Sequence, residues 1–204
     1  MVKLNLGSWD NIYLIPHFVE LGWTNIDFSN TNNIADLIVK DLTNPLDYED
    51  GTIDYIYTSN MLEHFDEING LQFLKEGFRV LKKGGILRII IPDIDKLIQV
   101  YLNWDTANET DSIYGTIQFY KNDWNIKDSV NFFNQFTVQE VLAPYGHRFY
   151  YNVENLRNKC KNIGFTKIKS FDQGNVTEHI VFENMDLHYG YHKDKACMYV
   201  EITK

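Results

Sequence analysis

The apolar run "ILRIII" (Ile86–Ile91) is the feature that most constrains the fold of this chain. It follows Gly84-Gly85 and ends at Pro92. A strand with so nearly continuous an apolar sequence is typical of a parallel sheet that helices cover on both faces. The run therefore favours an α/β fold.

The remaining elements alternate in the order that such a sheet needs. Helical spacing of apolar residues runs over 62–81 and is expected to end at Gly84-Gly85, and a second helix is predicted over 152–165. Strands joined by crossovers form a mostly parallel sheet. The predicted strands are 3–7, 23–28, one within 35–42, 52–60, 86–91, 166–172 and 196–203.

Residues 94–150 contain many aromatic side chains and no convincing strand. We expect a helical insertion, or lid, that lies over the sheet beside the substrate site. No linker or repeat divides the sequence, so 1–204 is predicted to be a single domain.

Composition narrows the classes of partner. The formal net charge of −9, without a compensating basic cluster, argues against nucleic acid. No apolar run is long enough to span a membrane and no secretory signal is visible, so a cytoplasmic protein is expected. Cys160 and Cys197 are expected to be reduced thiols. These observations leave small molecules as substrates.

Polar residues and one glycine stand where the predicted strands end. Ligands of open parallel sheets bind beyond the carboxyl ends of the strands. The residues at these ends are Gly7, Ser8 and Trp9 after the first strand, Asp27 at the second, Asp41 at the third, and Ser59 and Asn60 at the fourth.

Asp27 follows Gly7 by about 20 residues, the spacing at which a carboxylate accepts hydrogen bonds from both hydroxyls of a ribose. Asp41 could accept a hydrogen bond from an adenine amine. Nicotinamide dinucleotides and S-adenosylmethionine both use such an arrangement. A pyrophosphate requires a glycine-rich turn, whereas Gly7-Ser8-Trp9 has one glycine and a bulky tryptophan. The pattern therefore favours S-adenosylmethionine, which carries no phosphate.

The segments "KLNLG", "GWTNIDFS", "LEHF", "RVLKKGG" and the strand that ends in "IPD" resemble, in their order and spacing, the class I S-adenosylmethionine-dependent methyltransferases. The chain is most similar to a small bacterial branch associated with polysaccharide or surface-glycan biosynthesis. The resemblance implies a Rossmann-like sheet of seven strands, mostly parallel, with helices on both faces and the last strand antiparallel. Gly7-Ser8-Trp9 stands where the family commonly has Gly-Cys-Gly.

The resemblance also implies roles for individual residues. Gly7 and its neighbours would line the methionine part of the cofactor, Asp27 would hold the ribose, and Ser59 with Asn60 would lie under the sulfonium. The full set of expected cofactor residues is Asn5, Gly7, Ser8, Trp9, Asp27, Phe28, Asp41, Leu42, Ser59 and Asn60.

Methyl transfer to a hydroxyl requires a base, whereas an amine needs only to bind in its neutral form. His64 is the leading base candidate, since its ordinary pKa lies near neutrality and the family motif places it by the cofactor. The alternative is that Glu63 and His64 only cap and orient the following helix. Glu63, His147 or a tyrosine of the insertion could serve as the base instead.

The segment "APYGHRFYYN" lies where the insertion returns to the sheet. Arg148, Tyr150 and Tyr151 are therefore candidate substrate residues, and Arg148 could pair with a phosphate or carboxylate of the acceptor. The alternative is a loop whose aromatic residues simply pack. No metal site is predicted, because the loop residues His179, Asp186, His188, His192 and Asp194 match no ligand spacing.

The favoured function is methyl transfer from S-adenosylmethionine to a small polar acceptor, either a sugar hydroxyl or an amine such as phosphoethanolamine. A protein that binds the cofactor without catalysis is the alternative, and an NAD-dependent oxidoreductase is disfavoured by the missing glycines. The sequence leaves the oligomeric state open, with a homodimer among the options.

Overall fold

The computed structural model describes residues 1–8, 14–135, 146–171, 177–183, 185 and 196–204, and all statements below concern these residues. Its strands are β1 (Lys3–Leu6), β2 (Thr24–Asp27), β3 (Leu37–Val39), β4 (Ile53–Ser59), β5 (Leu81–Pro92), β6 (Lys167–Phe171) and β7 (Cys197–Thr203). Its helices are α1 (Leu14–Glu20), α2 (Glu67–Val80), α3 (Ile94–Leu102), α4 (Tyr114–Asn122), α5 (Ser129–Phe133) and α7 (Val153–Ile163), with short 3₁₀ turns η1 (Leu62–His64) and η3 (Ile180–Phe182).

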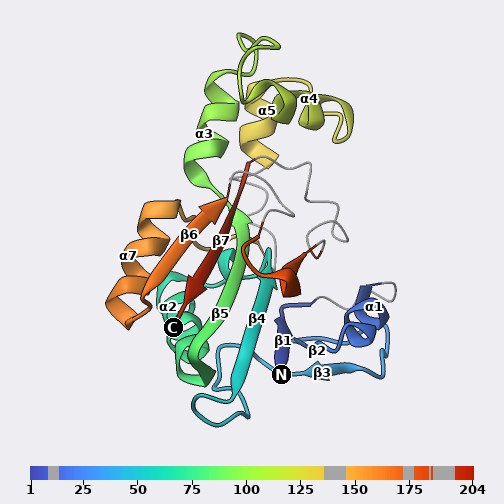
Figure 1. The fold of residues 1–204 in the computed structure, drawn as a ribbon. Helices are drawn as coiled ribbons and strands as arrows, with labels where there is room; N and C mark the ends of the chain where they lie inside the picture. Colours follow the sequence, from blue (N-terminus) through green and yellow to red (C-terminus); the bar gives the residue numbers. More distant parts are fainter. Residues whose placement is uncertain (9–13, 136–145, 172–176, 184, 186–195) are drawn as a thin grey trace.

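One seven-stranded sheet forms the centre of the structure, in the order β3-β2-β1-β4-β5-β7-β6 (Figure 1). The pairs from β3 to β5 are parallel, and β7 runs antiparallel to both β5 and β6. The predicted Rossmann-like architecture is confirmed, including the antiparallel final strand.

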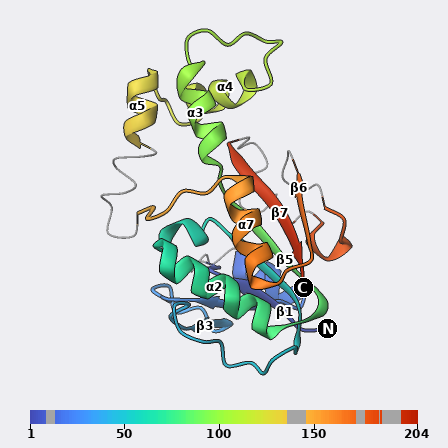
Figure 2. The same ribbon diagram turned by 90° about the vertical axis from the view of Figure 1, so that its left-hand side faces the viewer.

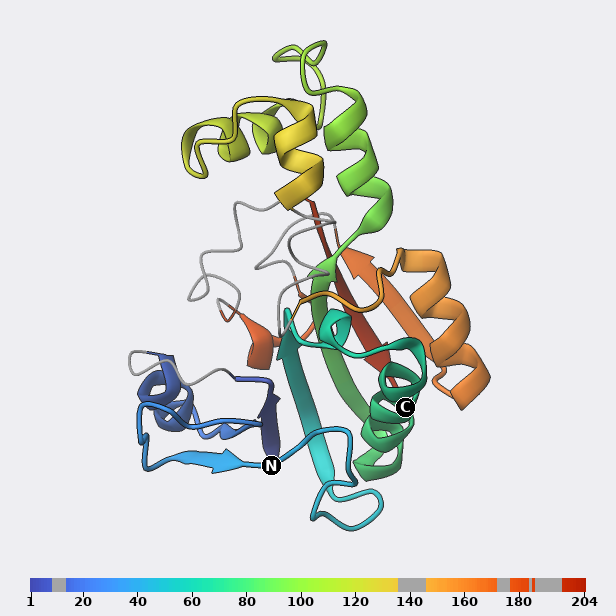
Figure 3. The same ribbon diagram turned by 180° about the vertical axis from the view of Figure 1, so that it is seen from behind.

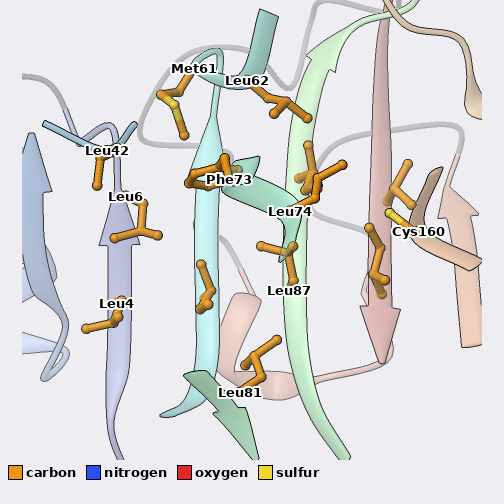
Figure 4. Close-up of a cluster of buried hydrophobic side chains, with 14 of the residues drawn as sticks. Leu4, Leu6, Leu42, Met61, Leu62, Phe73, Leu74, Leu81, Leu87 and Cys160 are labelled. Atoms are coloured by element: carbon orange, nitrogen blue, oxygen red, sulfur yellow. The ribbon is translucent and has the colours of Figure 1, made fainter. Parts of the chain in front are cut away.

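Helices cover both faces of the sheet, as predicted. Helices α2 and α7 lie together on one face (Figure 2). Their side chains Phe73, Leu74 and Cys160 belong to the same buried cluster as Leu87 of β5 (Figure 4). A second cluster contains Phe18 of α1 and Phe182 of η3, together with sheet residues such as Ile90, Tyr57 and Tyr199. Residues 87 and 90 of one strand thus face opposite cores, which explains the continuous apolar run.

The insertion has a small core of its own beyond the carboxyl ends of β5 (Figure 1). Trp104, Tyr120 and Phe132 bury their rings there against Leu97 and Val100 of α3. The aromatic-rich segment is thus helical, as predicted, in its described part up to 135. That it covers the substrate site stays a prediction.

The helix predicted over 62–81 begins later and ends earlier. Phe65 is extended, and the Asp66 carboxylate caps α2 by accepting a hydrogen bond from the Asn69 backbone N–H at 2.8 Å. A 3₁₀ turn therefore precedes the helix. At the other end Leu81 already belongs to β5, so Gly84-Gly85 is not a helix cap. These glycines lie within the strand, where a Cβ on Gly85 would meet the Lys82 carbonyl oxygen at 2.9 Å.

A buried ion pair joins β5 and β7, which run antiparallel. Arg88 of β5 lies directly opposite Glu201 of β7, and its Nη1 contacts Glu201 Oε1 at 2.7 Å. The Arg88 side chain is fully buried and that of Glu201 is 4% exposed. The Thr177 hydroxyl and the Glu178 backbone N–H also donate to the Glu201 carboxylate. The same carboxylate therefore holds the segment before η3 against the sheet.

We expect Glu201→Ala to lower the free energy of unfolding by about 3–5 kcal/mol, because it removes the carboxylate that faces a buried guanidinium. Asp47→Ala is the matched control, since the Lys40–Asp47 pair has an 87% exposed carboxylate and should cost below about 1 kcal/mol. Urea unfolding monitored by circular dichroism measures both variants. Equal decreases in the free energy of unfolding would show that the buried ion pair stabilises the protein no more than the exposed one.

Candidate active site

The strand order reverses between β1 and β4, which lie side by side (Figure 3). From β1 the chain proceeds outward to β2 and β3, and it then crosses to β4 on the other side. The carboxyl ends of the two central strands are therefore the switch point at which ligands bind in such folds. Gly7 and Ser8 follow β1, and Asn60 and Met61 follow β4.

Gly7 lies so close to the Met61 side chain that a residue with a Cβ would collide with it. Its φ is +69°, and a Cβ added there would lie 2.3 Å from Met61 Cγ and 2.6 Å from Met61 Cβ. Its N–H donates to the Ile26 carbonyl at 2.9 Å, and the N–H of the fully buried Ser8 donates to the same oxygen at 3.3 Å. The turn after β1 is thus fastened to the end of β2.

Asp27 ends β2 and is 5% exposed. Its Oδ1 accepts a hydrogen bond from the Ser29 N–H at 3.3 Å, and its backbone carbonyl accepts one from the Lys40 N–H at 2.7 Å. The side chain of Phe28, the next residue, is 56% exposed. An acidic group and an accessible aromatic ring therefore stand together beside the Gly7 turn.

Asp41 already has local partners. Its carboxylate accepts hydrogen bonds from the Thr43 N–H at 2.9 Å, the Thr43 hydroxyl at 2.7 Å and the Asn44 amide at 3.0 Å. These hydrogen bonds from Thr43 lower the pKa of Asp41. Leu42 is buried in the main core. Asp41 therefore stabilises the turn after β3, and its contact with an adenine stays a prediction.

Two buried polar side-chain atoms lie at the end of β4. The Ser59 hydroxyl and the Asn60 side-chain oxygen have no hydrogen-bond partner among the described residues. Asn60 has φ +48°, a conformation that asparagine tolerates better than most residues, and its N–H donates to the Ile90 carbonyl at 2.8 Å. Asn5 is buried on β1, and its amide donates to Asn25 Oδ1 at 2.9 Å. Unpaired buried polar atoms at a switch point are suited to a polar ligand.

The structure brings the three candidate catalytic residues together. Glu63 and His64 lie in η1, and the rings of His64 and His147 are edge to face with centroids 5.0 Å apart. His147 Nε2 lies 3.9 Å from Glu63 Oε1. Burial, with a smaller effect from His64, lowers the pKa of His147 to about 4, so its imidazole is neutral at pH 7.

Backbone hydrogen bonds fix the segment that carries His147. The N–H groups of Arg148 and Phe149 donate to the Glu63 carbonyl at 2.7 and 3.2 Å. Two residues later the Tyr151 carbonyl accepts from the Ile94 N–H at 2.9 Å. The end of the insertion therefore crosses the carboxyl ends of β4 and β5, where the candidate cofactor residues Ser59 and Asn60 lie.

The three candidate substrate residues differ in accessibility. Arg148 is exposed, and Tyr150 is half-buried with its ring 5.5 Å from that of His147. Tyr151 is fully buried in the core, and burial raises the pKa of its hydroxyl. A Cβ on Gly70 would lie 2.5 Å from that hydroxyl oxygen. Tyr151 therefore has no surface to offer a substrate here, whereas Arg148 and Tyr150 do.

Some candidates lie outside the described residues: Trp9, Asp186, His188, His192 and Asp194. His179 is described, and its Nε2 lies 3.7 Å from Glu201 Oε2. Cys160 and Cys197 are both buried and form no disulfide within the described residues. No helix in the described part of the chain is long and apolar enough to cross a membrane.

Sequence reasoning missed Met61 and Asp93. Met61 fills the space that the missing side chain of Gly7 leaves, and nothing in its local pattern marks it. Asp93 directly follows β5 at the end of "IPD", is 5% exposed and has a pKa that burial raises. Its carboxylate caps α3 through the Asp95 N–H at 3.1 Å, and that role was readable from the Asp before a helix.

The methyltransferase domain family matches residues 12–89, a range that contains α1 to α2 and ends within β5. No curated protein matches this chain by sequence.

Solved structures extend the likeness to the whole chain. It is similar over its full length, at 16% identity and a TM-score of 0.55, to 82% of a SAM-dependent methyltransferase of Thermotoga maritima described as a possible histamine N-methyltransferase. It is similar, at 13% identity and a TM-score of 0.55, to 90% of an S-adenosylmethionine-dependent methyltransferase of Mesorhizobium loti. Of this chain, 99% matches 48% of phosphoethanolamine N-methyltransferase 2 of Haemonchus contortus, at 12% identity and a TM-score of 0.52. The fold that this chain shares with these structures therefore includes the segments outside 12–89.

We expect Gly7→Ala to destabilise the protein more than Gly84→Ala. Both glycines have a positive φ, which costs an alanine about 1–2 kcal/mol. Nothing lies within 4 Å of a Cβ at Gly84, whereas one at Gly7 would collide with Met61 next to its backbone. The difference in free energy of unfolding should exceed about 1 kcal/mol. Equal values from urea unfolding would contradict the close approach.

Proposed function

We propose that this protein transfers the methyl group of S-adenosylmethionine to a small polar acceptor. The observation that carries the proposal is the position of Asp27 beside the single-glycine Gly7 turn at the switch point. A carboxylate at this position suits a ribose, and the turn lacks the glycines that a pyrophosphate needs. The methyltransferase domain at 12–89 supports the same cofactor.

The residues at the strand ends fit the parts of this cofactor. Asp27 would accept hydrogen bonds from the ribose hydroxyls, and the exposed Phe28 ring offers an apolar surface beside it. The backbone of Gly7 and Ser8 would approach the methionine part. The unpaired oxygens of Ser59 and Asn60 suit the region of the positive sulfonium. When bound, the cofactor supplies a methyl carbon activated by positive sulfur.

The acceptor would bind between this region and the end of the insertion. We assign its reacting group to the cluster of Glu63, His64 and His147, in which His64 is the least buried member. The exposed guanidinium of Arg148 would attract a phosphate or carboxylate on the acceptor. Alignment of acceptor and methyl carbon supplies much of the rate enhancement in such a displacement.

Three acceptor types have support. The Haemonchus contortus enzyme was solved with phosphomonomethylethanolamine and S-adenosylhomocysteine, and the Thermotoga maritima protein is described as a possible histamine N-methyltransferase. Both concern amines. The resemblance in the sequence adds a sugar hydroxyl of surface-glycan or related metabolism. The proposed class is therefore a compact amine or alcohol that carries a polar or anionic group.

Transfer of labelled methyl groups from S-adenosylmethionine tests the proposal. Phosphoethanolamine, histamine and nucleotide-activated sugars form the acceptor panel, and each is measured with and without enzyme. Methylation of one acceptor class is the expected result. Tight cofactor binding without turnover on any acceptor would favour the alternative of a non-catalytic cofactor-binding protein.

We expect Asp27→Ala to weaken S-adenosylmethionine binding by about 2–4 kcal/mol, or roughly 30- to 1,000-fold in Kd, because two charge-assisted hydrogen bonds to the ribose are lost. Isothermal titration calorimetry measures the change. Asp47→Ala, an exposed acid on the loop after β3, is the control and should bind normally. Unchanged affinity in a folded Asp27→Ala protein would place the cofactor elsewhere.

A further inference from the structure

Glu63, His64 and His147 form a group of metal-ligating side chains that the sequence alone did not join. Each offers one ligand atom, and these atoms all lie within 4.8 Å of one another. One carboxylate and two imidazoles form the donor set of many catalytic zinc sites, in which a fourth position stays open. We propose that these three residues bind one divalent transition-metal ion, with Zn²⁺ as the preferred occupant.

The spacing is close to what a zinc ion needs. Ligand atoms at about 2.0–2.2 Å from Zn²⁺ in tetrahedral geometry lie roughly 3.5 Å from one another. His147 Nε2 and Glu63 Oε1 are already 3.9 Å apart. Small side-chain rotations would therefore close the site around an ion, without movement of the backbone.

A buried nitrogen provides a second, independent observation. His64 Nδ1 is inaccessible to solvent and has no hydrogen-bond partner in the part of the chain that the structure describes. An unpaired imidazole nitrogen inside a protein is costly, and a metal ion satisfies it. This nitrogen belongs to the ring that packs edge to face on His147. His64 therefore lies beside the other two candidate ligands and has a buried nitrogen that a metal ion would satisfy.

The backbone holds the two ligand segments in place before any ion arrives. Glu63 and His64 are adjacent in η1, and the Glu63 carbonyl accepts the N–H groups of Arg148 and Phe149, directly after His147. The side chains of Glu63 and His147 are 2% and 11% exposed. A carboxylate at this depth favours a cation beside it, and a rigid frame reduces the cost of binding one.

The site would define the acceptor class, and this step rests on the proposed function. Its open position suits the oxygen of a hydroxyl acceptor, because a bound cation favours loss of the hydroxyl proton. The proton passes to solvent, the C–O bond forms as the C–S bond breaks, and S-adenosylhomocysteine leaves. The inference therefore favours O-methylation over transfer to an amine.

Metal binding is tested on the chain after treatment with a chelator and dialysis. We expect one Zn²⁺ per chain in a competition titration against a chromophoric chelator. Glu63→Gln, His64→Gln and His147→Gln, made singly, should each weaken binding at least about 100-fold. His17→Gln, a histidine of α1 outside the cluster, should bind normally. Variants that keep full affinity, or wild type that binds no zinc, would overturn the site.

X-ray absorption at the zinc edge of the wild-type protein covers the case in which a variant fails to fold. Two imidazole nitrogens and oxygen ligands at about 2.0–2.2 Å support the site, whereas sulfur or a single imidazole contradicts it. S-adenosylmethionine binding to the metal-free protein tests the proposed function separately. Chelator-resistant methyl transfer by zinc-free protein would keep that function, overturn the metal site and return His64 to the role of a general base.

Discussion

Parallel pairing of β1 with β4 brings Gly7 against Met61 at the point where the strand order reverses. A left-handed glycine without a side chain is required there, because any Cβ would occupy the space of the Met61 side chain. The Ile26 carbonyl fixes the same turn through two N–H groups. The pairing of β1 with β2 and with β4 places Asp27, Ser59 and Asn60 around this contact. A rigid frame of this kind suits alignment of a cofactor with an acceptor.

The insertion is connected to this frame at both ends. It starts at β5, where Asp93 caps α3, and it returns through a bridge between Asp93 and Tyr151. His147 lies on that return segment and is held by the Glu63 carbonyl through its neighbours. The residues proposed to meet the acceptor are therefore positioned by the insertion as well as by the sheet. Under the proposed function, variation in the insertion would alter acceptor choice with little effect on the candidate cofactor residues.

The sheet was largely predictable, because its strands are short apolar runs with clear boundaries. Asp27 was chosen as a cofactor candidate from its spacing after Gly7, which depends only on the length of one strand-helix-strand unit. The structure places it at the end of β2, and its contact with a ribose stays a prediction. The predicted start of α2 was wrong. The Asp66 carboxylate caps the helix by accepting a hydrogen bond from the Asn69 N–H, so the helix begins after Asp66 although the apolar spacing starts at Leu62. The end of that helix was wrong because Gly84 and Gly85 lie inside β5, where its register with β4 shifts, rather than at a helix cap.

The cluster of candidate catalytic residues shows the limit of local patterns. Glu63 and His64 were found from a motif, but nothing in the sequence joins them to His147, since that contact is made by the fold. Tyr151 looked like a substrate residue for the opposite reason: its neighbours reach the surface while its own ring lies in the core beside Phe149. Long-range contacts of this kind depend on packing, which periodicity does not report.

The central claim is that the switch point binds a nucleoside that carries a sulfonium and no pyrophosphate. Calorimetric titration of the wild-type protein with S-adenosylmethionine, S-adenosylhomocysteine and NAD tests it most directly. We expect one equivalent of each sulfur nucleoside to bind, and no heat of binding from NAD at the same concentrations. Binding of NAD without binding of S-adenosylmethionine would contradict the account.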